Sequence, residues 1–155
     1  MIWRSLSFAT CMLMLVLSAC LDSLEPEVGE LTAGACKNED SDPDVDVSYT
    51  NDIKPRLHGG CSCHSPVPNP TTGMIGGGSI DSTGFSVGDY GSLRRGGQNS
   101  RDNIVVPGDP CGSYLYQKLS DAPPSGSRMP TYGPYWSRTD MDLLSDWIAE
   151  GARDN

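Results

Sequence analysis

The stretch GGCSCHS, residues 59–65, contains the side chains on which the fold of this chain depends. Two cysteines, Cys61 and Cys63, stand on either side of one serine, and His64 follows the second cysteine directly. Cysteine forms disulfides and attaches cofactors, and both cysteine and histidine ligate metals. The segment therefore predicts either a cofactor site or a pair of structural cysteines. Features elsewhere in the sequence are needed to distinguish between these two predictions.

The first nineteen residues have the pattern of an export signal. Arg4 provides a positive charge, and the apolar run at residues 5–18 is shorter than the roughly 20 residues of a membrane span. The run ends in LSAC, residues 17–20, which resembles the lipobox of bacterial lipoproteins. That resemblance implies acylation at Cys20 and a lipid anchor in the bacterial cell envelope, in the periplasm or on the outer-membrane surface. An ordinary secretory signal that leaves Cys20 as a thiol is the alternative.

Residues 20–47 are strongly acidic and predict a flexible tether. The segment 21–47 contains nine acidic residues, one basic residue and no aromatic residue, a composition that cannot bury enough surface to order itself. The remaining residues 48–155 contain nine basic and eleven acidic residues without a basic stripe, which argues against nucleic acid as a partner. We expect a signal peptide at 1–19, a lipidated cysteine and tether at 20–47, and one small domain at 48–155.

Three helices are predicted within 48–155, joined by long loops rich in glycine and proline. The candidate N-caps are Asp52, Asp109 and the capping-box-like pair Ser137 and Asp140. Glycines follow the first and third helices, at Gly59-Gly60 and Gly151. The fold class is therefore all-α with a small core. Such domains usually need disulfides, a metal or a large cofactor for stability.

Five segments occur in a recognisable order. They are VSYTNDIKPRL (47–57), the Cys63-His64 pair, VVPGDPCGSYLYQKL (105–119), RMP (128–130) and LLSDWIAEGARDN (143–155). This order resembles the class I c-type cytochrome domains of bacterial exported lipoproteins, of the planctomycete and myxobacterial type. The resemblance implies a cytochrome c-like fold that encloses one haem c, and an electron carrier rather than a catalyst. It also implies a redox partner protein in the cell envelope and attachment to a lipid bilayer through the acyl anchor.

The resemblance implies roles for individual residues as well. His64 matches the proximal iron ligand, Cys63 the cysteine of a haem thioether and Met129 the distal iron ligand. Arg128 is a candidate contact for a haem propionate. Candidates for the haem lining, or for ordinary helix packing, are Tyr114, Leu115, Trp147 and Ile148. A His/Met pair raises the reduction potential of the iron and leaves no open position for a substrate.

The chain departs from the family pattern at one position, because Gly60 stands where C-x-x-C-H has its first cysteine. Residues two apart on an α-helix diverge by about 200°, so Cys61 and Cys63 are badly placed to reach both haem vinyl groups. Three explanations are open. In the first, haem is held by a single thioether from Cys63, and Cys61 pairs with Cys111 or Cys36. In the second, the backbone distorts so that Cys61 forms a second thioether, and in the third, haem is absent.

In the haem-free explanation, disulfides stabilise the domain instead. Cys36, Cys61, Cys63 and Cys111 can form two bridges, each contributing roughly 2–4 kcal/mol to the free energy of unfolding. The protein would then be a disulfide-stapled envelope lipoprotein that acts as a structural or binding module. A further alternative is Cu(I) or zinc held by the soft ligands Cys61, Cys63, His64 and Met129.

Overall fold

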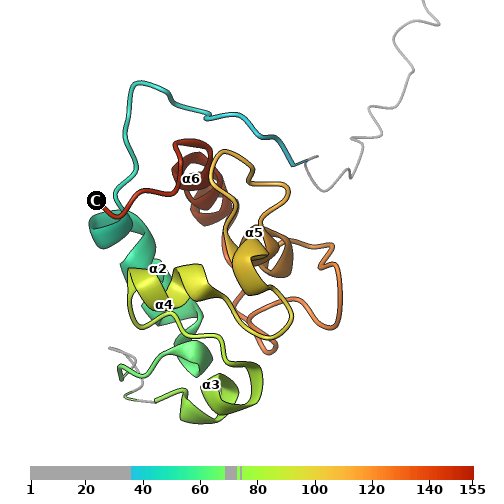
Figure 1. Cartoon of the computed structure of the whole chain (residues 1–155). Coiled ribbons are helices and arrows are strands. Elements are labelled where there is room, and N and C mark those ends of the chain that lie inside the picture. The colour runs from blue at the N-terminus through green and yellow to red at the C-terminus, as the bar shows by residue number, and fades with distance from the viewer. Residues whose placement is uncertain (1–35, 69–72, 74) are drawn as a thin grey trace, which may run out of the picture. The chain divides into compact units, whose positions relative to one another are not determined.

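The protein is described by a computed structural model, which covers residues 36–68, 73 and 75–155. The α-helices are α2 (Lys54–Gly60), α3 (Gly77–Thr83), α4 (Tyr90–Arg95), α5 (Tyr114–Leu119) and α6 (Arg138–Ala149). The π-helical turn η1 (Tyr49–Ile53) and the 3₁₀ turns η2 (Ser62–His64) and η3 (Arg101–Ile104) complete the regular structure (Figure 1). The described residues form no strand, which agrees with the predicted all-α class, but they form five short α-helices where three were expected.

The N-terminal predictions fall largely outside the described residues. The export signal at 1–19, Cys20 and the tether up to residue 35 all lie there. Among the helices that the structure describes, none has both the length and the apolar composition needed to cross a bilayer.

The first helical segment begins earlier than predicted. Ser48 is the N-cap of η1, and its Oγ accepts a hydrogen bond from Asn51 N at 3.1 Å. Asp52, the expected N-cap, instead accepts a hydrogen bond from Ser48 N at 3.0 Å. The α-helix α2 continues from η1 and ends at Gly60, as the glycine pair predicts. The prediction of Asp52 as the cap is therefore wrong, because Ser48 caps the chain one turn before it.

Helix α6 follows its sequence pattern closely. Ser137 Oγ accepts a hydrogen bond from Asp140 N, and the Asp140 carboxylate accepts one from Ser137 N, which confirms the capping box. The fully buried face of the helix is formed by Leu144, Trp147 and Ile148. Beyond the helix Gly151 adopts a φ of 101°, a conformation that glycine reaches without a steric cost from Cβ.

Helix α5 starts later than predicted. Asp109 Oδ1 accepts a hydrogen bond from Gly112 N at 2.8 Å. The residue predicted to cap α5 therefore stabilises a separate turn at residues 109–112 that precedes the helix. Ser113 is the N-cap residue, and its Oγ accepts a hydrogen bond from Val106 N at 2.8 Å instead of from the helix. These bonds between side chains and nearby backbone compete with helical hydrogen bonding and keep residues 109–112 out of α5.

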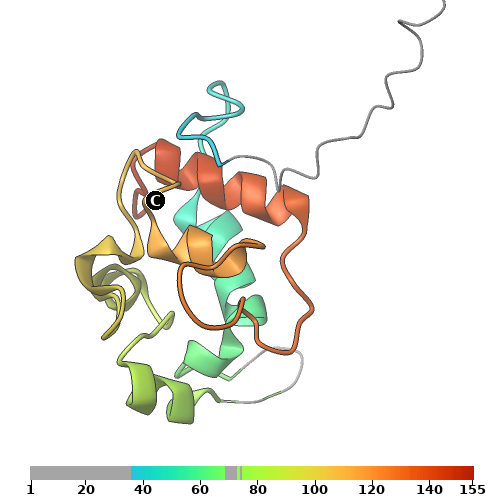
Figure 2. The same ribbon diagram turned by 90° about the vertical axis from the view of Figure 1, so that its right-hand side faces the viewer.

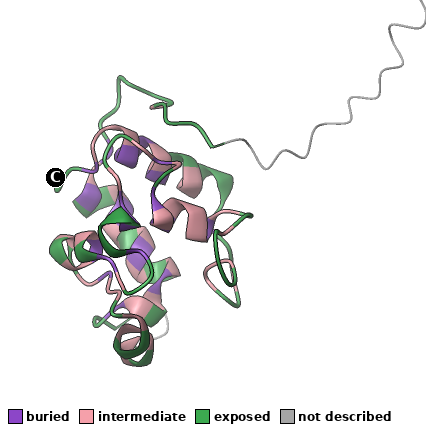
Figure 3. Ribbon diagram, turned by 45° about the vertical axis from the view of Figure 1, so that its right-hand side comes forward, coloured by how far each residue is buried: buried purple, intermediate pink, exposed green. Residues whose placement is uncertain are grey.

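The hydrophobic core is one cluster of buried side chains from η1, α2, α4, η3, α5, α6 and the loops between them. Two of these helices, α5 and α6, lie side by side (Figure 2). Side chains that are fully buried include Ile53, Leu57, Leu93, Leu144, Trp147 and Ile148. Burying a side chain of this kind contributes about 1.5–3 kcal/mol relative to leaving it in water. The long loops carry mostly exposed or half-buried residues (Figure 3), so the helices provide most of this burial.

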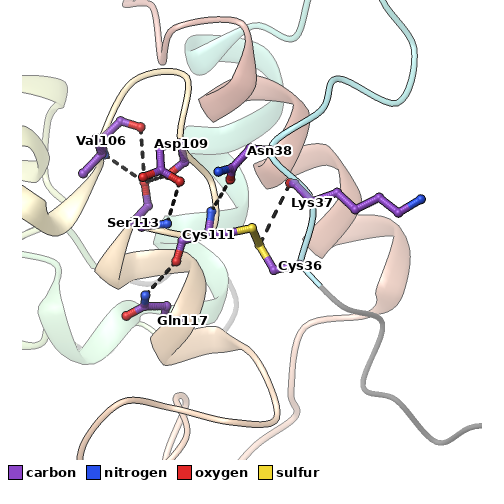
Figure 4. The surroundings of a disulfide bond; sticks show 9 residues. Cys36, Lys37, Asn38, Val106, Asp109, Cys111, Ser113 and Gln117 are labelled. Carbon is purple, nitrogen blue, oxygen red and sulfur yellow. Dashed lines mark hydrogen bonds between the residues drawn. A yellow bond between two sulfur atoms is a disulfide. The ribbon is translucent and has the colours of Figure 1, made fainter.

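The disulfide joins Cys36 to Cys111, which are 75 residues apart in the sequence (Figure 4). Asn38 Oδ1 accepts a hydrogen bond from Cys111 N at 2.8 Å and fixes the same two segments together. Cys61 is therefore not paired with Cys36 or Cys111, as one of the three explanations expected, because these two cysteines are paired with each other.

Residues 36–47, expected to belong to the flexible tether, contact the domain beyond the disulfide. Ser41 donates hydrogen bonds from N and Oγ to the Asp146 carboxylate, at 2.8 and 2.7 Å. Val47 N donates to both carboxylate oxygens of Glu150, at 3.0 and 2.9 Å. Residues 36–47 are therefore attached to the domain at α6 and at the residue that follows it, because the carboxylates of Asp146 and Glu150 accept hydrogen bonds from Ser41 and Val47.

Tyr49 and Tyr90 form an edge-to-face pair in the core, with ring centroids 5.2 Å apart, and Tyr49 also packs on Trp147. The hydroxyl of Tyr49 is buried without a hydrogen-bond partner, whereas the hydroxyl of Tyr90 donates to Ala152 O at 2.7 Å. Burial raises the pKa of Tyr49 from 10.0 to about 12, and the charges of Asp154 and Asp89 add to the rise.

We expect Tyr49→Phe and Tyr90→Phe to have different effects on the free energy of unfolding. Tyr49→Phe removes a buried hydroxyl without a partner, so stability should stay equal or rise by about 1 kcal/mol. Tyr90→Phe removes a hydroxyl that is bonded, so stability should fall by about 1 kcal/mol. Urea unfolding at neutral pH measures both variants. A larger loss for Tyr49→Phe than for Tyr90→Phe would contradict this account.

The raised pKa of Tyr49 predicts that the folded state loses stability at alkaline pH. The unfolded chain releases the Tyr49 proton near pH 10.0, whereas the folded chain keeps it up to about 12. The contribution of Tyr49 is therefore fully present below pH 10 and declines as the pH rises toward 12. Urea midpoints measured across this range should fall less steeply for Tyr49→Phe than for the wild type, and equal slopes would contradict the assignment.

A cavity lined by Cys61, His64 and Met129

A cavity of about 310 Å³ opens beside the turn that contains Cys61 and His64. Its volume lies in the range of roughly 300–1,000 Å³ that is typical of small-molecule and cofactor sites. The residues around it include Cys61, His64, Phe85, Ile104, Leu115, Leu119 and Met129. Three residues that the sequence singles out thus line the same cavity: Cys61 and His64 from one turn, and Met129 from a segment 65 residues after His64.

The turn η2 determines which side chains face this cavity. His64 N donates to Cys61 O at 2.8 Å, an i to i+3 hydrogen bond of the 3₁₀ type. In a 3₁₀ turn the side chains at i and i+3 eclipse, so Cys61 and His64 lie on the same side. Cys63 is one residue out of phase, is exposed and is not among the lining residues. The cysteine that lines the cavity is therefore Cys61, whereas the resemblance implies Cys63 as the haem thioether and Cys61 only as a possible second one.

The two thiols of this turn have different surroundings. Cys61 is 8% exposed, and burial raises its pKa to about 12, with a smaller contribution from Cys63. The Cys61 side chain is consequently a neutral thiol at physiological pH. Both cysteines are outside any disulfide of the described residues. The structure thus presents one protected thiol at the cavity and one at the surface.

His64 presents a half-buried imidazole to the cavity. Its Nδ1 atom is buried and has no hydrogen-bond partner of regular geometry, and its ring lies 5.2 Å from the ring of Phe85. Burial lowers the pKa of His64 below its usual value, and an interaction with the Phe85 backbone opposes part of this effect. The imidazole is therefore neutral at physiological pH, which is the form that ligates metals.

Met129 reaches the cavity from the proline-rich loop between α5 and α6. Met129 N donates to Lys118 O at 2.8 Å and fixes the loop against α5. Thr131 Oγ1 donates to Met129 Sδ at 3.4 Å. The side chain is half-buried and packs against the core. A thioether sulfur thus joins the cavity wall 65 residues after His64 in the sequence.

Arg128, the candidate propionate contact, is not among the lining residues and is engaged elsewhere. It forms an ion pair with Asp121, donates from Nε to Leu119 O at 2.8 Å, and stacks 4.2 Å from the Tyr135 ring. The cation that lines the cavity is Lys118, whose Nζ donates to the carbonyls of two loop residues. The helical spacing of Lys118, three residues after Leu115, is the sequence signal that could have identified it.

The four lining candidates of the sequence divide into two pairs. Tyr114 and Leu115 line the cavity from α5. Trp147 and Ile148 are fully buried in the core, where Trp147 Nε1 donates to Arg153 O at 2.9 Å, and they are not among the lining residues. Ordinary helix packing is therefore the role of the α6 pair.

Gly60, at the position of the missing cysteine, is packed against Trp136. A Cβ atom at residue 60 would overlap the indole nitrogen of Trp136, which is 9% exposed. At the neighbouring Gly59, a Cβ atom would have open space around it. The indole of Trp136 thus takes the volume that a side chain at position 60 would need.

We expect the two adjacent glycines to respond in opposite ways to alanine. Gly59→Ala should raise the free energy of unfolding by about 0.5–1 kcal/mol, because alanine costs less backbone entropy in a helix. Gly60→Ala should lower it by about 1–3 kcal/mol, because the added methyl group overpacks against Trp136. Thermal or urea unfolding measures the difference. In a Trp136→Ala background, Gly60→Ala should cost much less free energy of unfolding than in the wild type. An unchanged cost would contradict the proposed clash between residue 60 and Trp136.

Comparison with known proteins assigns no family to this chain. No protein-family model, no curated protein and no solved structure matches it. Among the described residues, no group of three or more His, Cys, Asp or Glu side chains is arranged to hold a metal ion. The case for a function therefore rests on the residues that line the cavity.

Proposed function

We propose that this protein is a membrane-tethered monohaem c-type cytochrome that carries single electrons outside the cytoplasm. The observation that carries the proposal is the convergence of Cys61, His64 and Met129 on one cavity. These side chains supply a thiol, an imidazole and a thioether, which are the groups that attach haem and ligate its iron on both faces. The order of segments that resembles cytochrome domains supports the same proposal.

The lining residues fit a haem group in their chemistry. His64 would be the proximal ligand, since its imidazole lines the cavity and burial lowers its pKa, which favours the neutral form. Met129 would be the distal ligand, and Leu115, Leu119 and Ile104 would pack against the apolar ring edge. A haem ligated by His and Met supplies reversible one-electron chemistry at a raised reduction potential.

Lys118 would replace Arg128 as the partner of a haem propionate. Lys118 lines the cavity, whereas the Arg128 guanidinium is held by Asp121 and Tyr135. The lining also includes polar residues, which are Gln98, Asn99, Ser125, Ser127 and Thr131. The cavity therefore offers both an apolar wall and polar groups for the carboxylate side of the cofactor.

The sequence supports a location on the cell envelope. The LSAC segment at 17–20 supports acylation of Cys20, and more than one acyl chain gives stable anchoring to a bilayer. An acidic segment follows and would keep the domain soluble at the membrane surface. The partner we propose is a redox protein of the same compartment, and nucleic acid is disfavoured by the charge of residues 48–155.

The second candidate is a haem-free envelope lipoprotein that acts as a structural or binding module. The disulfide between Cys36 and Cys111 favours it, because such a bridge stabilises a small domain without a cofactor. The two candidates differ in a single measurable property, which is covalently attached haem.

We expect the protein, exported without its lipid signal from cells that load haem, to show a Soret band that resists acid–acetone extraction. His64→Ala should abolish the band or reduce it severely, because the proximal ligand is removed. His58→Ala is the matched control, since His58 lies on α2 outside the cavity lining and its Nε2 lies 3.0 Å from Val87 O. A colourless wild-type protein would exclude the cytochrome and favour the haem-free module.

We expect Met129→Ala to keep the haem attached but to remove the weak long-wavelength sulfur–iron band and to lower the reduction potential. Met141→Ala is the control, because Met141 packs against the core from α6 and does not line the cavity. Absorption spectra and redox titration measure both variants. Persistence of the sulfur–iron band in Met129→Ala would contradict the distal assignment.

A further inference from the structure

The turn after α2 is one residue shorter than C-x-x-C-H, and its geometry changes accordingly. The helix ends at Gly60, and the His64 N to Cys61 O hydrogen bond then sets a 3₁₀ turn. With three residues per turn, Cys61 is aligned with His64, and Cys63 points about a third of a turn away. Cys61 is buried at the cavity, whereas Cys63 is exposed and outside the lining.

Neighbouring segments hold this turn in its orientation. Gly76 N donates to Ser65 O at 2.9 Å, and a Cβ atom at Gly76 would overlap the Cys63 backbone. Val87 N donates to His64 O at 2.8 Å. These two bonds hold the carbonyls of His64 and Ser65, and Gly76 packs on the Cys63 backbone, so the turn is fixed with Cys63 exposed.

A second sulfur has no place at the position that C-x-x-C-H would use. Gly60 packs so closely on Trp136 that even a Cβ atom would overlap the indole ring. Trp136 is itself buried and belongs to the core cluster. The cavity therefore has one thiol within its wall among the described residues, and that thiol belongs to Cys61.

We infer that Cys61, and not Cys63, attaches the haem, through a single thioether. This inference rests on the proposed cytochrome function. The Cys61 thiol adds across one vinyl group: the S–H bond breaks, a C–S bond forms at the vinyl carbon next to the ring, and a proton goes to the terminal carbon. The addition is redox-neutral and needs no oxidant. The other vinyl group stays intact, and Cys63 stays a free surface thiol.

The test compares the wild type with Cys61→Ser and Cys63→Ser, which differ by two positions in the same turn. Each protein is exported, purified and denatured, and its intact mass is measured for one added haem. Cys63→Ser should retain the added mass, whereas Cys61→Ser should lose it and release any haem into acid–acetone. Retention by Cys61→Ser together with loss by Cys63→Ser would overturn the inference.

A measurement on the wild type makes the test independent of how the variants fold. Fragment sequencing of the haem-carrying peptide should locate the haem on residue 61, and native alkylation should modify Cys63 alone. Haem on residue 63, or on both residues, would overturn the inference while leaving the cytochrome function intact. A wild type without haem would overturn the proposed function, and this inference with it.

Discussion

The hydrogen bond from His64 N to Cys61 O tightens the chain from an α-helix into a 3₁₀ turn at the end of α2. This change of pitch brings Cys61 and His64 to the same side and leaves Cys63 in solvent. On a continued α-helix, a spacing of three residues would also bring the two side chains near each other, but less directly aligned. The bonds from Gly76 N and Val87 N then fix the turn to the segments on either side of it.

The wall of the cavity combines the turn η2, helix α5 and the loops at residues 97–100 and 125–131. The core cluster occupies the space around α6 and η1, and α5 contributes Leu115 and Leu119 to the core cluster as well as to the cavity wall. An apolar ring bound in this cavity would form dispersion contacts with Leu115 and Leu119. In the proposed cytochrome, stability and cofactor binding are therefore coupled through the same side chains.

The disulfide between Cys36 and Cys111 also limits the reach of the proposed lipid anchor. Because residues 36–47 are bonded to the domain, the stretch from Cys20, the proposed acylation site, to the first attached residue is sixteen residues. Such a stretch spans at most about 55 Å when fully extended. Attachment at Cys36 shortens the tether that composition alone suggests. In the proposed lipoprotein, the domain would therefore meet its redox partners close to the membrane.

The sequence by itself determined the features that depend on residues close together in the chain. The capping box of α6 and the glycine that follows the helix are local patterns, and the structure contains both. Only the tertiary structure decided the start of α5, since Ser113 is bonded to Val106 and not to the helix. It also decided the cysteine pairing, because Cys36 and Cys111 meet only in the fold. The alignment of Cys61 with His64 depends on a turn held by residues 76 and 87, which no local pattern contains.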